Sequence, residues 1–216
     1  MVNPVMTNTN QSNEIQKVIK NYCVAITGAI ATGKSEVANI LRKLGYIVID
    51  ADQLSRDVVH PGSKIYEKII EVFGESIKKP DGTIDRHMLL AIIMHDPVAK
   101  KTLESIMHPA IQLKFESEVK KQNLGQGTLF FYEAALIFEL GRENQFKECW
   151  ATYCSEDTQI KRLSNRSQLT REQCLSIINS QLPATVKASM ATKSIDTECD
   201  RDSLSEKIKK ILKTTL

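Results

Sequence analysis

Short apolar runs alternate along the chain with longer segments in which apolar residues recur every three or four positions. The apolar, β-prone runs predict strands at residues 22–27, 46–49, 128–132, 149–154 and 193–195. The helical spacing predicts helices at residues 37–44, 51–60, 63–73, 86–94, 97–107, 109–122 and 171–181. Alternating strands and helices predict an α/β protein with a parallel, doubly wound sheet of five strands.

Acidic residues follow three of these predicted strands. The second strand ends in Asp50, the third in Glu133 and the fifth in Asp196. Ligands of open parallel sheets bind at the carboxyl ends of the strands. We therefore expect the functional residues to gather at this edge of the sheet.

The segment GAIATGKS, residues 28–35, lies between the first predicted strand and the first predicted helix. Glycines let the backbone turn its N–H groups inward, and the start of a helix adds partial positive charge, so this arrangement forms an anion site. In such a loop Lys34 would reach the β and γ phosphates, and the Ser35 hydroxyl would be a ligand of Mg²⁺. Because a strand precedes the motif and a helix follows it, we predict nucleotide binding.

Two carboxylates, Asp50 and Asp52, lie at and just beyond the end of the second predicted strand. Beside a triphosphate site they could contribute to a magnesium shell, or one could accept the proton of an attacking hydroxyl. Asp50 has an equally good alternative role as the cap of the next helix. For Asp52 the chemical role is favoured.

Residues 53–123 separate the second and third predicted strands with several helices, whereas a parallel crossover needs only one. A helical insertion of this size beside the strand ends can hold a second substrate. The sequence therefore favours a transferase over a simple ATPase.

Composition and charge narrow the choice of partners. The 216 residues are 42% hydrophobic, and the net charge of +3 is too small to indicate a nucleic-acid or membrane surface. Five cysteines without a C-x-x-C pair indicate neither disulfides nor a zinc site and favour a reducing, cytoplasmic setting. Residues 1–21, rich in polar amides, are expected to form a flexible extension, with residues 15–22 ordering against the core. We expect a monomer or a weak homo-oligomer.

The chain resembles the dephospho-CoA kinase family from about residue 22 almost to its carboxyl end. The resemblance depends on the order and spacing of several segments: ITGAIATGKS, VIDADQLSRDVVHPGS, IMHPAI, EAALIFE, IKRLSNRSQLTREQCLSIINSQ and KSIDT. It implies a P-loop NTPase fold with a helical substrate domain and a small helical lid. The implied reaction is ATP-dependent phosphorylation of the ribose 3′-hydroxyl of dephospho-coenzyme A, the last step of CoA biosynthesis, with Mg²⁺.

The resemblance also implies roles for individual residues. Asp52 would be the general base toward the ribose hydroxyl, and Arg162 and Arg166 would come from the lid to the γ-phosphate. His108 is assigned a substrate contact or a structural role, since His-Pro also indicates a boundary between two helices. The residues that would bind ATP and its metal are Gly28, Ala29, Ile30, Ala31, Thr32, Gly33, Lys34, Ser35 (also the metal ligand), Glu36, Arg162 and Arg166.

The sequence departs from the family pattern in two places. Ala29 and Ala31 stand where the family usually has glycine, which narrows the allowed backbone angles of the loop. Glu133 stands where the family usually has Asp, so its role toward Mg²⁺ or the substrate is left open. In the same segment, Glu139 could be the functional acid in place of Glu133, or it could lie on a helix face without a role.

These assignments give a division of the chain and two rival functions. The expected parts are a nucleotide-binding core (22–52, 124–157 and 189–216), a CoA-substrate domain (53–123) and a lid (158–188), after the extension (1–21). The rivals are another P-loop small-molecule kinase, of nucleoside, nucleotide or shikimate type, and a non-catalytic nucleotide-binding module. A GTPase switch is disfavoured, because the chain lacks D-x-x-G after the third strand and an N/T-K-x-D segment.

Overall fold

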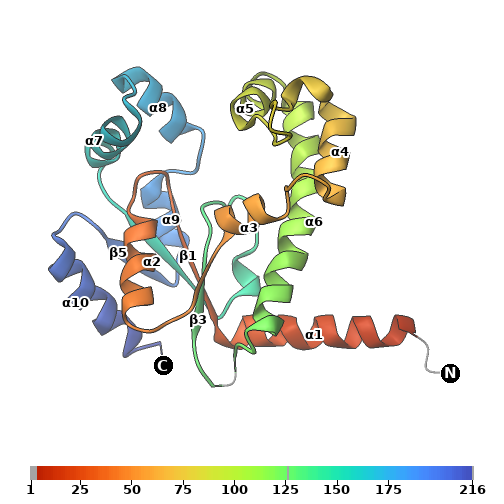
Figure 1. The fold of residues 1–216 in the computed structure, drawn as a ribbon. Helices are drawn as coiled ribbons and strands as arrows, with labels where there is room; N and C mark the ends of the chain where they lie inside the picture. Colours follow the sequence, from red (N-terminus) through yellow and green to blue (C-terminus); the bar gives the residue numbers. More distant parts are fainter. Residues whose placement is uncertain (1–3, 126, 216) are drawn as a thin grey trace. The chain divides into compact units, whose positions relative to one another are not determined.

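The computed structural model describes residues 4–125 and 127–215, with side chains from residue 12 onward. The described residues form one sheet of five parallel strands in the order β2-β3-β1-β4-β5. Figure 1 shows the fold, with the sequence coloured from red to blue. The predicted parallel five-stranded sheet is thus confirmed. The strands are β1 (Cys23–Gly28), β2 (Val48–Asp50), β3 (Phe130–Glu133), β4 (Glu148–Tyr153) and β5 (Lys193–Asp196).

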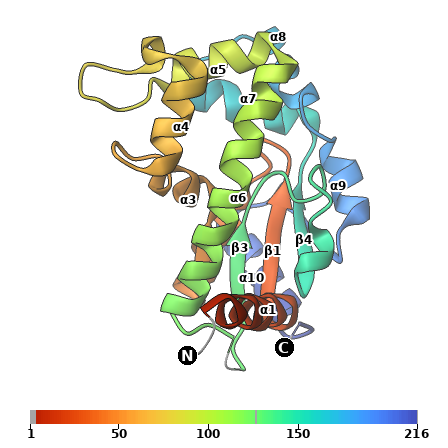
Figure 2. The ribbon, with the colours of Figure 1, turned by 90° about the vertical axis from the view of Figure 1, so that its right-hand side faces the viewer.

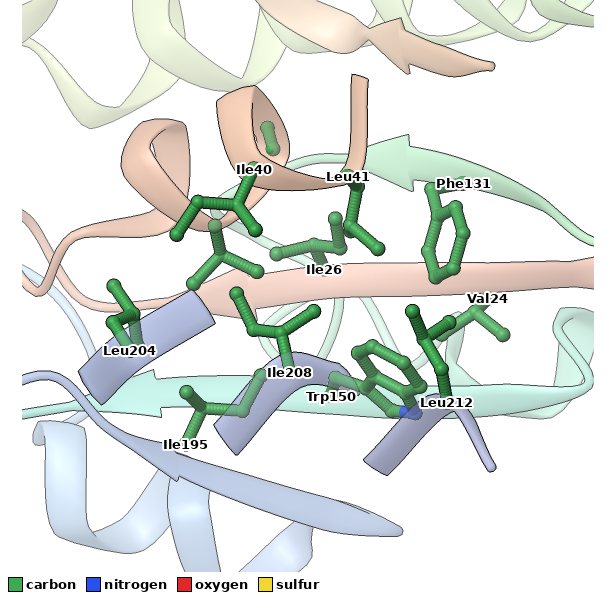
Figure 3. Close-up of a cluster of buried hydrophobic side chains, with 12 residues drawn as sticks. Val24, Ile26, Ile40, Leu41, Phe131, Trp150, Ile195, Leu204, Ile208 and Leu212 are labelled. Atoms are coloured by element: carbon green, nitrogen blue, oxygen red, sulfur yellow. The ribbon is translucent and has the colours of Figure 1, made fainter. Parts of the chain in front are cut away.

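Strand β1 is central and fully buried, as expected for a continuous apolar run in a parallel sheet. One of its faces packs against helices α2 (Lys34–Lys43) and α10 (Arg201–Leu212). Figure 3 shows this core, in which Ile26 and Trp150 of the sheet meet Leu41 and Ile208 of the two helices. Gly45, predicted to end the first helix, follows α2 with φ 90°, the left-handed conformation common after a helix end.

Helices α9 (Ala184–Met190) and α1 (Pro4–Tyr22) also contact the sheet. The sequence patterns did not predict α9. For the residues before β1 they predicted a flexible extension in which residues 15–22 order against the core, and the structure describes a helix there. The last turns of α1 pack onto the core: Ile19 is buried, and Lys20 Nζ donates to the Asn144 and Phe146 carbonyls at 2.9 and 3.2 Å. These carbonyls belong to the short helix η2 (Glu143–Gln145) and the residue after it.

Helices α7 (Glu156–Ser167) and α8 (Arg171–Asn179) form a hairpin with its own apolar cluster. The cluster contains Ile160, Leu163, Cys174 and Ile178. A capping box at the start of α8, in which Thr170 and Gln173 exchange side-chain and backbone hydrogen bonds, fixes where that helix begins. The hairpin therefore has a small apolar core of its own.

Contacts between residues divide the chain into two compact units. The second unit is Ala51–Gln122, and the first contains the chain before and after it. The second unit consists of α3 (Ala51–Asp57), α4 (Lys64–Phe73), η1 (Glu75–Ile77), α5 (Arg86–His95) and α6 (Pro97–Lys121). It has a separate core that includes Tyr66, Ile69, Ile77, Leu89 and Ile106.

Helix α6 corrects one prediction about this unit. The His108-Pro109 pair was expected to separate two helices, but α6 is one helix of 25 residues with Pro109 inside it. Figure 2 shows α6 as a single long helix. Proline inside a helix removes one hydrogen bond and costs about 3 kcal/mol. Buried side chains on both sides of it, Ile106 at 8% and Phe115 at 1% exposure, offset that cost by packing.

A second, smaller correction concerns α3, which was expected to run to residue 60 and ends at Asp57. The Ser63 hydroxyl donates to the Val58 carbonyl at 2.9 Å. In a longer helix this carbonyl would accept from a backbone N–H, and here a side chain replaces that donor. Pro61 also disfavours helical angles at the residue before it.

Candidate functional site

The loop from Gly28 to Ser35 begins at the carboxyl end of the central strand and ends in the first turn of α2. Gly28 has φ 146°, and a Cβ there would lie 2.3 Å from Thr152 Oγ1 and 2.6 Å from the Thr152 carbonyl oxygen. Gly33, the N-cap of α2, has φ 90°. Both framework glycines of the motif are therefore required by geometry, one by space and one by backbone conformation.

Ala31, at the middle of the loop, has φ 60°. This left-handed conformation costs an L-residue about 1–2 kcal/mol because Cβ approaches the neighbouring carbonyl. The chain keeps the loop conformation here without the glycine that would remove the strain. Contacts from outside the loop must hold it.

Two loop side chains support the backbone. Thr32 is fully buried, and its hydroxyl donates to the Ala29 carbonyl at 2.7 Å and lies 2.7 Å from Thr152 Oγ1. Lys34 Nζ donates to the Gly28 and Ala29 carbonyls at 3.1 Å each, which places its charge over the loop. A positive charge beside the N–H groups of the first turn of α2 makes this an anion-binding arrangement.

Glu36, predicted as a nucleotide contact, lies in the first turn of α2. Its carboxylate forms an ion pair with Arg201 Nε of α10 at 2.7 Å. In this structure the Glu36 side chain joins two helices on one face of the sheet.

A hydroxyl and a carboxylate meet at the carboxyl edge of the sheet. Ser35 Oγ donates to Glu133 Oε1 at 2.8 Å, and Asp50 lies beside Glu133 in the register of β2 and β3. Burial raises the pKa of Glu133; the hydrogen bond from Ser35 opposes this, and the nearby charge of Asp50 adds to it. Arg42, 3.8 Å from Glu133 Oε2, and Lys34 act in the lowering direction.

Arg162 of α7, which the resemblance assigns to the γ-phosphate, is hydrogen-bonded to the loop and to Thr197. Its guanidinium donates to the Ala31 carbonyl at 3.3 Å, to Thr197 Oγ1 at 3.0 Å and to the Thr197 carbonyl at 2.7 Å. Arg166 lies one turn further along α7 and is exposed. The structure thus brings Arg162, but not Arg166, into hydrogen bonds with the loop.

The remaining predicted residues, Asp52 and His108, belong to the second unit. Asp52 is in the first turn of α3, two residues after Asp50 ends β2, and is exposed. His108 is half-buried in the interior of α6.

Sequence reasoning missed four residues that support the loop: Thr152, Thr197, Gln159 and Gln181. Thr197 directly follows β5, so the rule that sites gather at strand ends could have found it. Its hydroxyl donates to the Thr32 carbonyl at 2.8 Å. The two glutamines contact Ile30. Gln181 is the last residue of the segment IKRLSNRSQLTREQCLSIINSQ, which carries part of the family resemblance, and Gln159 directly precedes that segment.

A glycine loop of this geometry, between a central parallel strand and a helix, defines a P-loop nucleotide-binding protein. Comparison with known proteins narrows the class. The chain belongs to the dephospho-CoA kinase family, whose model matches residues 22–202.

Individual relatives agree with this assignment. A dephospho-CoA kinase from Geobacter sulfurreducens is 38% identical over 188 residues, covering 87% of this chain and 95% of the relative. A solved dephospho-CoA kinase from Campylobacter jejuni is 27% identical with a TM-score of 0.65, covering 88% of this chain and 95% of that one. The crystal structure of TT1252 from Thermus thermophilus, also 27% identical, has a TM-score of 0.76 and covers 89% and 97% of the two chains. Among the described residues, no helix has the length and apolar character that a membrane span requires.

Proposed function

We propose that this protein transfers the γ-phosphoryl group of ATP to the ribose 3′-hydroxyl of dephospho-CoA, giving coenzyme A and ADP. Membership of the dephospho-CoA kinase family supports the choice of acceptor. The phosphate loop, with Lys34 Nζ 3.1 Å from two loop carbonyls and Ser35 bonded to Glu133, is the observation that carries the choice of donor.

The donor atoms at the end of the loop suit Mg²⁺, which prefers oxygen ligands and usually binds through one or two protein groups and substrate phosphates. Ser35 Oγ and a Glu133 oxygen are already 2.8 Å apart, and these two residues would hold the ion. When bound, the ion would neutralise charge on the phosphates. Elsewhere among the described residues, no cluster of three His, Cys, Asp or Glu side chains forms an alternative metal site.

The protein's own groups would act mainly by positioning and by charge. Loop N–H groups and Lys34 would hold the β and γ phosphates, and Asp52 would accept the proton of the attacking hydroxyl. Arg166, exposed on the α7–α8 hairpin, would add positive charge as the phosphoryl group transfers. Arg162, held by Ala31 and Thr197, would serve the same site from the loop side.

We also propose a cytoplasmic location. The five cysteines, all within the described residues, are free thiols, and this supports a reducing compartment.

The acceptor is tested by supplying the purified protein with ATP, Mg²⁺ and, separately, dephospho-CoA, adenosine or shikimate. ADP release and the mass of the product are measured, and only dephospho-CoA should gain a phosphoryl group. Phosphorylation of adenosine or shikimate instead would support the rival small-molecule kinase. ATP binding without transfer to any acceptor would support the non-catalytic module.

The base is tested by Asp52→Asn, which keeps the size of the side chain but cannot accept the proton. Turnover should fall by roughly two orders of magnitude or more, while the Kd for ATP stays within a few fold. Asp57→Asn is the matched control, because Asp57 lies on the same helix and bonds Gln53 Nε2 at 2.7 Å. Equal turnover of the Asp52→Asn variant and the wild type would refute the assignment.

A further inference from the structure

Ile30, near the middle of the phosphate loop, is bonded by two glutamine side chains. Its N–H donates to Gln181 Oε1 at 2.8 Å, and its carbonyl accepts from Gln159 Nε2 at 2.7 Å. One glutamine supplies an acceptor and the other a donor, so together they satisfy this residue as a neighbouring β-strand would.

The two glutamines come from the two ends of the α7–α8 hairpin. Gln159 lies in the first turns of α7 and is buried, and Gln181 follows the last turn of α8. The side chains of Ile30 and Ala31 pack against the hairpin's apolar cluster. The loop is therefore attached to both ends of the hairpin and to its core.

Gln181 is itself held in place by its neighbour in the chain. The Leu182 N–H donates to Glu139 Oε1 at 3.3 Å, and the same oxygen lies 2.6 Å from Nζ of the fully buried Lys187. Because Glu139 follows β3, this contact ties the end of the hairpin to the sheet.

The loop needs such support because Ala31 holds a left-handed conformation that an alanine disfavours. Gln159 bonds the residue before Ala31, and Arg162 bonds the Ala31 carbonyl itself. The hydrogen bonds to the hairpin thus fall where the loop backbone is strained.

We propose that Gln159 and Gln181 are positioning residues that hold the phosphate loop in its anion-binding shape and couple it to the α7–α8 hairpin. Neither glutamine needs to touch the nucleotide. Their effect passes through Ile30 and the strained Ala31 to the N–H groups that follow. The proposal rests on the proposed role of this loop in binding ATP.

The test uses Gln159→Met and Gln181→Met, which keep the length of the side chain and remove its hydrogen bonds. The Kd for ATP should rise about tenfold in each variant, since each leaves one backbone group of Ile30 without its partner. The KM for ATP should rise with it, while the KM for dephospho-CoA stays unchanged. Gln173→Met is the matched control, because the Gln173 side chain accepts from the Thr170 N–H in the capping box of α8, a hydrogen bond within the hairpin.

Amide hydrogen exchange of the nucleotide-free protein gives a second, local measurement. In Gln181→Met the Ile30 N–H should exchange faster, while the strands of the sheet keep wild-type protection. The proposal is refuted if Gln159→Met and Gln181→Met both bind ATP as the wild type does. It is also refuted if Gln173→Met weakens ATP binding as much as they do. If the wild type fails to bind ATP, the proposed function fails, and the exchange of Ile30 still decides whether the glutamines hold the loop.

Discussion

Lys187 and Glu139 form an ion pair whose removal should destabilise the nucleotide-binding unit strongly. Lys187 Nζ lies 2.6 Å from Glu139 Oε1 and also donates to the Ala135 carbonyl at 2.8 Å. The lysine side chain is 0% exposed and the glutamate 20% exposed. Glu139→Gln would leave the buried ammonium without a compensating negative charge.

Breaking a buried pair by removing one partner typically costs about 3–5 kcal/mol. Glu139 is partly exposed, so we expect the lower end, about 3 kcal/mol. For a protein of this size, about 2–4 °C of melting temperature corresponds to each kcal/mol, which gives a fall of roughly 6–12 °C. The free energy of unfolding is measured by urea denaturation, and the melting temperature by circular dichroism.

Glu206→Gln is the matched control. The Glu206–Lys209 pair has nearly the same length, 2.7 Å, but its side chains are 63% and 46% exposed. Exposed pairs contribute about 0–1 kcal/mol, so this variant should unfold almost like the wild type. Equal destabilisation by the two glutamine substitutions would refute the argument, because burial would then have no effect.

A double variant separates the charge from the packing. Lys187→Met with Glu139→Leu removes both charges and keeps most of the apolar volume, so its loss of stability should be smaller than the sum of the two single losses. Additive losses would mean that the two side chains act independently.

Two further predictions concern the loop and the carboxyl edge. Ala31→Gly should raise the free energy of unfolding by up to about 1 kcal/mol in thermal or urea unfolding, because the relief of strain exceeds the added entropy of the unfolded chain. Ala29→Gly should lower the free energy of unfolding, since Ala29 is not among the residues with positive φ and has no such strain to lose. A change of the same sign in both variants would contradict the reasoning. For Glu133, burial raises the pKa above the ordinary 4.5, so its stabilising contribution is complete below that pH and is lost as pH rises through the raised pKa. Glu133→Gln should therefore gain stability relative to the wild type as pH rises from about 4.5 toward neutral in urea denaturation without metal, and the opposite trend would contradict the cause assigned to the shift.

Local signals explain why the sheet and the phosphate loop could be predicted from the sequence. The apolar runs are short and bounded by polar residues, and the loop motif carries its own strand and helix flanks. The acidic strand ends predicted an active edge, and Ser35 and Glu133 do meet there at 2.8 Å.

Features that depend on distant contacts were not predictable in the same way. The passage of α6 through Pro109 is decided by the packing of Ile106 and Phe115, which no local rule contains. Gln159 and Gln181 reach Ile30 across more than a hundred residues of sequence, and neither the family segment that ends at Gln181 nor the residues around Gln159 indicate this partner. Helix α9 is short, and its fully buried Lys187 is a residue type that pattern reasoning assigns to solvent.

The burial of Trp150 has a practical consequence. It is the only tryptophan of the chain and lies at 0% exposure between the sheet and its helices. Its intrinsic fluorescence therefore reports on the first unit alone, and circular dichroism at helical wavelengths weights the second unit as well. Comparing the two signals during denaturation would reveal whether the two units melt together or one after the other.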